Sequence, residues 1–274
     1  MDTPVPYSTP QLVAPETWLI PNLADAGDGL FLPVNSMVIC GAEPVIVDTG
    51  APMHRELWLE KTFSVVEPED VRWIFLSHDD GDHTGGLLDA LDMCPNATLV
   101  TNFFSVERLA LEKPALPLER MRWIEPGQSF DAGDRTLVLF KPPIFDGPTT
   151  RGLYDTKTAA MWIVDTFPCL TPGAIHYVQD LPPDLVEENL PAMNSLVSPW
   201  HQWLDPVVYR RHVDDVEALG VLAVASAHGP ILTGDAIHAA FDVVRDLAGQ
   251  PIIPAPGQEL LDDLVAQILV DSPA

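Results

Sequence analysis

Ser77-His78-Asp79-Asp80-Gly81-Asp82-His83 is the most informative stretch of the sequence. It follows the apolar run 71–76, which predicts a buried strand. Loops at the carboxyl ends of strands are where α/β folds place ligand sites. This loop offers two imidazoles and three carboxylates within six residues, 78–83, and these are donor groups that metal ions prefer. The sequence therefore predicts a metal site nucleated by His78, Asp80, Asp82 and His83.

Strands and helices alternate on both sides of this loop. Short β-branched or apolar runs bounded by turn residues predict strands at 29–32, 36–40, 44–48, 97–101, 135–140, 159–164 and 221–225. Apolar residues at helical spacing predict helices at 53–63 and 104–111, and a longer helical zone at 183–219. The alternation predicts one α/β domain over residues 1–274. Residues 1–28 are expected to form an irregular arm, and two helices are expected within 235–274.

Further donor residues recur after later predicted strands. Asp146 lies in a proline-rich loop after the strand that ends at Phe140, Asp165 directly follows the strand 159–164, and His228 follows the strand 221–225. One loop cannot fill the coordination spheres of two metal ions, because each ion needs at least three or four donors. Their shared placement at strand ends makes these three residues candidates for completing a two-metal centre.

Ordinary structural roles remain open for several of these residues. Asp82 could cap the N-terminus of a helix that begins near Thr84. Asp146 precedes a glycine, which is a common turn pair. His201 stands in the aromatic cluster 199–203, where packing at a helix start is favoured over a place in a pocket above the metals. A cap alone does not explain two histidines that flank several aspartates, so metal binding remains the favoured interpretation of the loop.

The loop resembles the metallo-β-lactamase signature HxHxDH, and more closely the HxExDH form of the flavodiiron proteins and the stand-alone oxygen-binding diiron proteins. The stretches that share this resemblance are Asn35-Ser36, Asp48-Thr49, 143–155, Asp165-Thr166-Phe167 and His228-Gly229-Pro230. The resemblance covers residues 29–232 and implies an α/β fold, the metallo-β-lactamase αββα sandwich. We expect no flavodoxin domain, because the chain ends soon after residue 232.

The resemblance also implies a ligand set. One metal would take His78, Asp80 and Asp146, the other would take Asp82, His83 and His228, and Asp165 would bridge the two. The family has Glu or His where this chain has Asp80, and His where it has Asp146. Both replacements keep a donor atom, although a half-empty or single-metal site stays an alternative. Asp48 would stabilise the metal loop without ligating, and Tyr154 and Asp155 are candidates for orienting a ligand.

The donor set bears on the choice of metal and reaction. Three imidazoles and four carboxylates form an oxygen-rich environment that favours two iron ions, with manganese or zinc as alternatives. A diiron centre predicts a protein that binds or reduces O2 or NO, and would need an external electron donor for turnover. Zinc or manganese would instead predict a hydrolase of a small ester, thioester or lactone. A non-enzymatic metal-binding protein is a third hypothesis.

Composition limits the partners. With 14 basic and 40 acidic residues the formal charge is −26, which repels phosphate backbones and anionic headgroups. We therefore expect a small-molecule ligand or substrate, and neither nucleic acid nor membrane as a partner. Three scattered cysteines and an N-terminus without a basic or apolar leader segment predict a cytoplasmic protein. We also expect a homo-oligomer.

Overall fold

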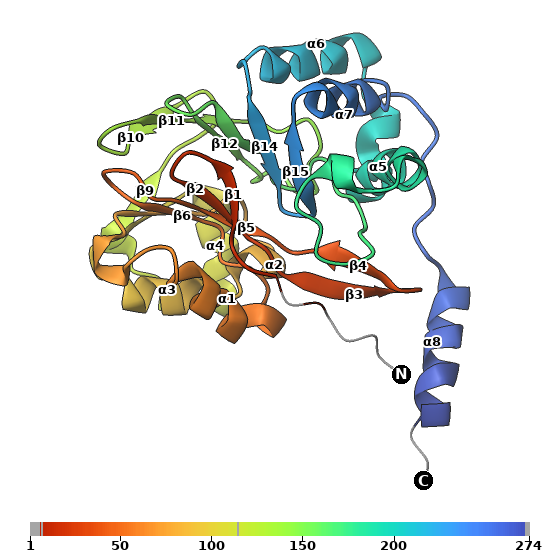
Figure 1. The fold of residues 1–274 in the computed structure, drawn as a ribbon, viewed down its shortest axis with the longest axis horizontal. Helices are drawn as coiled ribbons and strands as arrows, with labels where there is room; N and C mark the ends of the chain where they lie inside the picture. Colours follow the sequence, from red (N-terminus) through yellow and green to blue (C-terminus); the bar gives the residue numbers. More distant parts are fainter. Residues whose placement is uncertain (1–5, 7, 114, 272–274) are drawn as a thin grey trace.

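The computed structural model of this chain describes residues 6, 8–113 and 115–271. Within these residues, the strands form two large mixed sheets and one small hairpin (Figure 1). The first sheet has the order β1 (Gln11–Ala14), β2 (Thr17–Ile20), β5 (Ser36–Ile39), β6 (Val45–Val47), β7 (Trp73–Phe75), β8 (Thr98–Thr101) and β9 (Met121–Trp123). The second has the order β10 (Ser129–Asp131), β11 (Thr136–Phe140), β12 (Gly152–Asp155), β13 (Ala160–Trp162), β14 (Ala223–Ser226) and β15 (Gly229–Thr233). The hairpin pairs β3 (Leu23–Gly27) with β4 (Leu30–Pro33).

Helices cover the outer face of each large sheet (Figure 1). The first sheet is covered by α1 (Arg55–Thr62), α3 (Leu87–Met93) and α4 (Phe103–Glu112). The second is covered by α5 (Pro183–Val197), α6 (Pro206–Glu217) and α7 (Asp235–Arg245). Two further helices, α2 (Gly81–Thr84) and α8 (Gln258–Asp271), lie outside these layers. The predicted αββα sandwich is therefore confirmed.

The alternation of side chains along each strand explains the layers. In β6, Val45 and Val47 point into the core between the two sheets, whereas Ile46 packs against the helices on the other face. Successive residues of a strand point to opposite faces of its sheet, so a strand that is apolar on both faces is covered on both. Trp162 of β13 enters the same central core from the second sheet.

Parallel pairing aligns the strand ends that carry the candidate residues. In the first sheet β6 pairs with β7 so that Val47 lies opposite Phe75, and Asp48 and the 77–83 loop leave the same edge. In the second sheet β13 pairs with β14 in parallel, and Trp162 lies opposite Ala225. Asp165 and His228 follow these two strands by three residues each, counted from Trp162 and Ala225.

The prediction of an irregular arm over residues 1–28 is wrong for residues 11–27, and residues 1–5 and 7 lie outside the described residues. Within the described residues β1 and β2 pair with each other, β2 continues the first sheet through β5, and β3 pairs with β4. Proline and isolated polar residues obscured the short alternating runs, which pairing with neighbouring strands then stabilised. Helices α7 and α8 lie within the predicted C-terminal segment.

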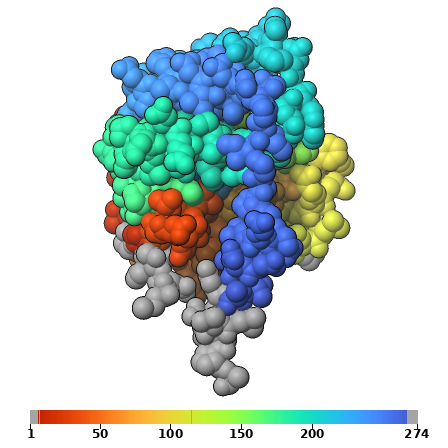
Figure 2. Space-filling model, turned by 90° about the vertical axis from the view of Figure 1, so that its right-hand side faces the viewer, coloured from red at the N-terminus to blue at the C-terminus, as the bar shows by residue number. Residues whose placement is uncertain are grey.

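Hydrogen bonds fasten the segment between α7 and α8 to the body of the protein. Gly249 donates its backbone N–H to the His201 carbonyl, and Ile253 donates to the Ser195 hydroxyl. Figure 2 shows this blue segment running down the surface to α8. Residues 258–266 of α8 are exposed. No helix among the described residues is long and apolar enough to cross a membrane.

Candidate metal centre

The structure brings the seven predicted donor residues together where the strand ends of the two sheets meet. They come from four segments that are far apart in the chain. Their ligand atoms form overlapping groups, namely His78 with Asp80 and Asp146, His78 with His83 and Asp165, and Asp82 with His83 and His228. Within each group the atoms lie within 4.8 Å of one another. The sequence prediction of which residues meet therefore agrees with their placement; their role as ligands stays a proposal.

The first group lies around Nε2 of His78. This nitrogen is 3.9 Å from Oδ2 of Asp80 and 3.7 Å from Oδ1 of Asp146. Asp80 precedes α2 without capping it, and Asp146 belongs to the loop that follows β11. The side chains of Asp80 and Asp146 are 53% and 35% exposed, so this side of the centre faces solvent.

The second group lies deeper and contains two histidines. Oδ2 of Asp82 is 3.7 Å from Nε2 of His83 and 3.4 Å from Nε2 of His228. Asp82 lies inside α2 and not at its N-terminus, so the alternative in which it caps this helix is excluded. His83 is buried and His228 is nearly so.

Asp165 lies between the two groups. Its Oδ2 is 3.7 Å from Nε2 of His78, whereas its Oδ1 is 3.2 Å from Nε2 of His83 and 3.3 Å from Nε2 of His228. One carboxylate oxygen thus faces each group, which is the arrangement that a bridging ligand needs. The backbone here is strained, because Val164 has a φ of 60°, a costly conformation for a β-branched residue.

The hydrogen bond that each histidine makes through Nδ1 directs its Nε2 atom towards the centre. His83 donates from Nδ1 to Asp48 at 2.9 Å, and His228 donates from Nδ1 to the Pro33 carbonyl at 2.9 Å. Nδ1 of His78 is 3.0 Å from the Ser77 hydroxyl. Such partners fix the tautomer in which Nε2 carries a lone pair for a metal ion.

Asp48 fastens the 77–83 loop through hydrogen bonds. Its carboxylate accepts from the Ser77 backbone N–H at 2.7 Å, the Ser77 hydroxyl at 2.6 Å, His83 Nδ1 at 2.9 Å and Trp162 Nε1 at 3.0 Å. Sequence reasoning missed Trp162, which reads as an ordinary core residue of β13. Only the pairing of the two sheets brings its indole to Asp48.

Two predicted orienting residues do not reach the centre. Asp155 lies at the far end of β12, where it accepts from Arg135 Nη1 and the Thr158 hydroxyl, both at 2.8 Å. Tyr154 packs against the core beneath α5 to α7. The loop after β11 passes the centre at Asp146 and then returns into β12, whose strand carries these residues away at about 3.3 Å per residue. Their assignment to the site is therefore corrected.

The donor atoms meet the requirements of a metal pair. Nε2 of His83 and both carboxylate oxygens of Asp165 are buried and have no hydrogen-bond partner among the described residues. Such atoms are costly to bury unless something else satisfies them. Donors bound to one ion at about 2.0–2.2 Å lie about 3–3.6 Å from one another. Three of the four separations between Asp165 or Asp82 and the two deep histidines are 3.2–3.4 Å and fit that spacing, and the fourth, from Asp82 to His83, is 3.7 Å.

Charge interactions among these residues are strong. Burial would favour the neutral imidazole of His83, but Asp48 and Asp165 oppose it and raise the pKa of His83 well above its usual range. Burial disfavours the charged carboxylate of Asp165, but His78 and His228 outweigh this effect. The pKa of Asp165 is therefore held well below its usual range. Burial and the neighbouring Asp146 raise the pKa of Asp80 to about 7. A cation is the group that would relieve the carboxylate repulsion at Asp80.

His201 has a structural role, as the favoured interpretation of its cluster predicted. It is fully buried, with Nδ1 donating to the Leu247 carbonyl at 2.8 Å and Nε2 at 2.9 Å from the Ser195 hydroxyl. These hydrogen bonds connect the start of the segment between α7 and α8 to helix α5.

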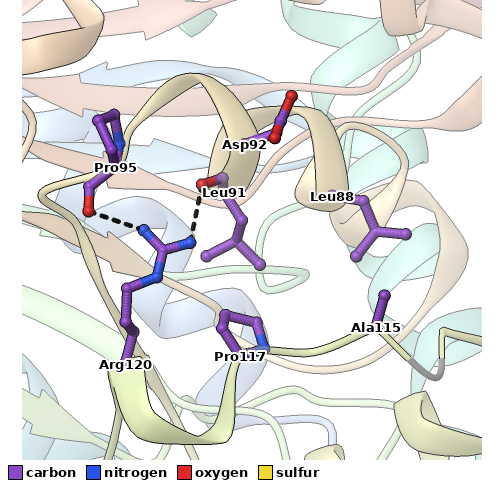
Figure 3. Close-up of a pocket in the computed structure, with 7 residues that line it drawn as sticks. All are labelled: Leu88, Leu91, Asp92, Pro95, Ala115, Pro117 and Arg120. Carbon is purple, nitrogen blue, oxygen red and sulfur yellow. Dashed lines mark hydrogen bonds between the residues drawn. The ribbon is translucent and has the colours of Figure 1, made fainter.

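A surface hollow elsewhere lacks the groups for such chemistry. It has a volume of about 430 Å³ and lies between α3 and residues 115–120 (Figure 3). Its one cation, Arg120, donates to the carbonyls of Leu91 at 2.8 Å, Pro95 at 3.0 Å and Cys94 at 3.1 Å. The guanidinium therefore stabilises the C-terminal end of α3, and no candidate metal residue lines this hollow.

The sandwich and its cluster of histidines and aspartates define the class of protein. Residues 29–184 match the metallo-beta-lactamase superfamily, which is more than half of the chain, so the chain belongs to this superfamily.

Within that superfamily, the chain is similar to diflavin and type A flavoproteins. It is 25% identical over 216 residues to diflavin flavoprotein A 1 of Synechocystis sp., covering 74% of this chain and 35% of that protein. It is 25% identical over 205 residues to the type A flavoprotein fprA of Rhodobacter capsulatus, covering 72% of this chain and 45% of that protein. The chain thus spans about a third to a half of these relatives' lengths.

Solved structures agree with this fold. The flavodiiron protein from Giardia intestinalis superposes with a TM-score of 0.73 at 18% identity, covering 88% of this chain and 60% of that protein. The rubredoxin oxygen:oxidoreductase from Desulfovibrio gigas superposes with a TM-score of 0.71 at 15% identity, covering 84% of this chain and 62% of that one.

Proposed function

We propose that this chain is a non-haem diiron protein that binds or reduces O2 or NO. The observation that carries the proposal is the position of Asp165, whose two buried oxygens face His78 on one side and His83 and His228 on the other. The likeness to flavodiiron proteins supports the same assignment. His78, Asp80 and Asp146 would hold one ion, and Asp82, His83 and His228 the other, with Asp165 shared.

The donor set favours iron over zinc. It contains four carboxylates and three imidazoles, and hard oxygen donors suit iron and manganese better than the histidine-rich sets typical of zinc hydrolases. Iron held by these residues would supply the redox chemistry that side chains lack. Manganese in the same residues is the alternative cofactor.

The protein's own residues would bind the metal ions and orient the histidine rings that hold them. Asp48 holds the His83 ring by its Nδ1, and the Pro33 carbonyl holds the His228 ring in the same way. Asp80 has the most exposed side chain of the set, so a small ligand would enter beside it.

An external electron donor is part of the proposal, because reduction of O2 or NO needs electrons that these side chains do not supply. We further propose a homo-oligomer. Leu260, Leu261, Leu264 and Val265 of α8 are each 46–52% exposed, which leaves apolar surface for a second copy. One domain in a cytoplasmic setting remains the prediction from the sequence.

The superfamily also contains hydrolases, so hydrolysis of a small ester, thioester or lactone is the second candidate. Metal analysis of protein purified without chelators separates the two. The proposal expects two iron ions per chain, an absorption band in the near ultraviolet that bleaches on anaerobic reduction, and O2 or NO consumption with a chemical reductant. Asp165→Asn should lose both ions, whereas the exposed control Asp92→Asn should keep them. Two zinc ions together with ester turnover would refute the proposal.

A further inference from the structure

Asp79 is the one acidic residue of the metal loop that does not face the candidate donors. Its side chain is only 7% exposed and is bound by three partners from other segments. Arg108 of α4 binds it through both Nε and Nη2, the latter at 2.7 Å. Ser105 of α4 donates its hydroxyl at 3.1 Å, and Thr149 of the loop after β11 donates its hydroxyl at 2.8 Å.

These contacts join three elements into one network. Nη2 of Arg108 also donates to the Thr149 hydroxyl at 2.8 Å, so Thr149 accepts from Arg108 and donates to Asp79. Asn102, at the N-terminus of α4, donates to the Thr149 carbonyl at 3.1 Å and accepts from the Ser105 backbone N–H at 2.8 Å. The loop that carries Asp80 and the loop that carries Asp146 are thus both fastened to α4.

We propose that Asp79 and Arg108 are positioning residues that set the separation of Asp80 and Asp146 and thereby tune the metal position formed with His78. The inference rests on the proposed function, since it assumes that these three residues bind a metal ion. Asp79 is adjacent to Asp80 in sequence, and Thr149 is three residues from Asp146, so a shift of the network displaces both donors.

The donors themselves have few other supports. The Asp80 side chain makes no cap bond with α2, and the Asp146 side chain accepts a long hydrogen bond of 3.4 Å from the Thr150 hydroxyl. The deeper position is held differently, because His83 is fixed by Asp48 and His228 by the Pro33 carbonyl. The Asp79 network therefore acts on one metal position and not on both.

A purely electrostatic role for Arg108 predicts the opposite sign. Its guanidinium is 48% exposed and lies close enough to Asp80 and Asp146 to interact with their charges. If Arg108 acted only as a nearby positive charge, its removal would strengthen binding of a divalent cation. If it acts by positioning, its removal weakens binding, because outer residues that orient ligands typically contribute about 10–100-fold in metal affinity.

The test is calorimetric titration of the metal-free, full-length protein with Mn²⁺ alone. The wild type should show two binding steps. Arg108→Gln should weaken one step by about tenfold or more and leave the other within about twofold. Arg108→Lys keeps the charge but loses the two-point contact, and should weaken the same step. Arg55→Gln is the matched control, because Arg55 makes a two-point pair with Asp89 between α1 and α3.

A second pair of variants identifies which step changes. Asp146→Asn should remove the step that Arg108→Gln weakens, and adding Arg108→Gln to it should have no further effect on the remaining step. Tighter Mn²⁺ binding by Arg108→Gln, or equal weakening of both steps with a lower melting temperature of the metal-free protein, would overturn the inference. Failure of the wild type to bind two ions would instead count against the proposed function.

Discussion

The repulsion between Asp80 and Asp146 predicts that a single substitution stabilises the metal-free protein while it removes one of the two metal ions. Burial and Asp146 raise the pKa of Asp80 from the ordinary value of 3.8 to about 7. A group with a raised carboxyl pKa keeps its proton in the folded state where the unfolded chain has lost it. Its contribution to stability therefore falls as the pH rises from about 4 to about 7. Asp80→Asn removes this loss.

The size of the stability gain follows from the pKa of Asp80 and the exposure of its side chain. A rise from 3.8 to about 7 corresponds to about 4 kcal/mol if the group were fully shielded from water. The side chain is 53% exposed, so solvent screening reduces the effect to about 1–2 kcal/mol. For a chain of this size that is a rise of about 2–6 °C in melting temperature at pH 8, and almost none at pH 4.

Asp82→Asn is the matched comparison in the same loop. Burial disfavours the charged form of Asp82, but His83 and His228 outweigh it and lower its pKa, so its charge stabilises the metal-free fold. We expect Asp82→Asn to lower the melting temperature at pH 8 while Asp80→Asn raises it, both measured by thermal unfolding in chelator. Both variants should lose one of the two metal ions. A destabilised Asp80→Asn at pH 8, or a gain that is the same at pH 4, would refute the reasoning.

Two further outcomes follow from the same geometry. Asp48→Asn should lower the free energy of unfolding by about 1–3 kcal/mol, because buried donors of Ser77, His83 and Trp162 lose a charged acceptor. The measurement is denaturant unfolding, and a change below about 0.5 kcal/mol would contradict this expectation. Mn²⁺ affinity should fall by about tenfold or more from pH 8 to pH 6, because the raised pKa values of Asp80, His83 and His228 leave protons that a metal must displace. An affinity independent of pH over that range would show that these groups are already unprotonated.

The sequence predicted which side chains would lie together because the ends of strands can be recognised in it. His78, Asp165 and His228 each follow a short apolar run, and the pairing of β6 with β7 and of β13 with β14 brings those ends to one edge. The αββα order could also be predicted, since apolar runs alternated with helical spacing. Local patterns were enough wherever a residue's role depends on where its own strand ends.

The rest depends on contacts between segments that no local pattern records. The three strands before Asp28 were missed because their pairing partners, and not their own composition, stabilise them. Tyr154 and Asp155 were placed at the centre because they follow Asp146 in sequence, but β12 carries them away along the strand. Nearness in sequence is a poor guide across a loop that turns back into a sheet.

Asp80 and Asp146, the two aspartates that depart from the family pattern, depend on the network around Asp79 for their positions. Aspartate has a shorter side chain than glutamate or histidine, so Asp80 and Asp146 reach a common ion only if their loops approach closely. Close approach of two carboxylates is repulsive without the ion, and the raised pKa of Asp80 reflects this. Arg108 and Thr149 hold the two loops against that repulsion. The network is therefore needed most before the metal binds.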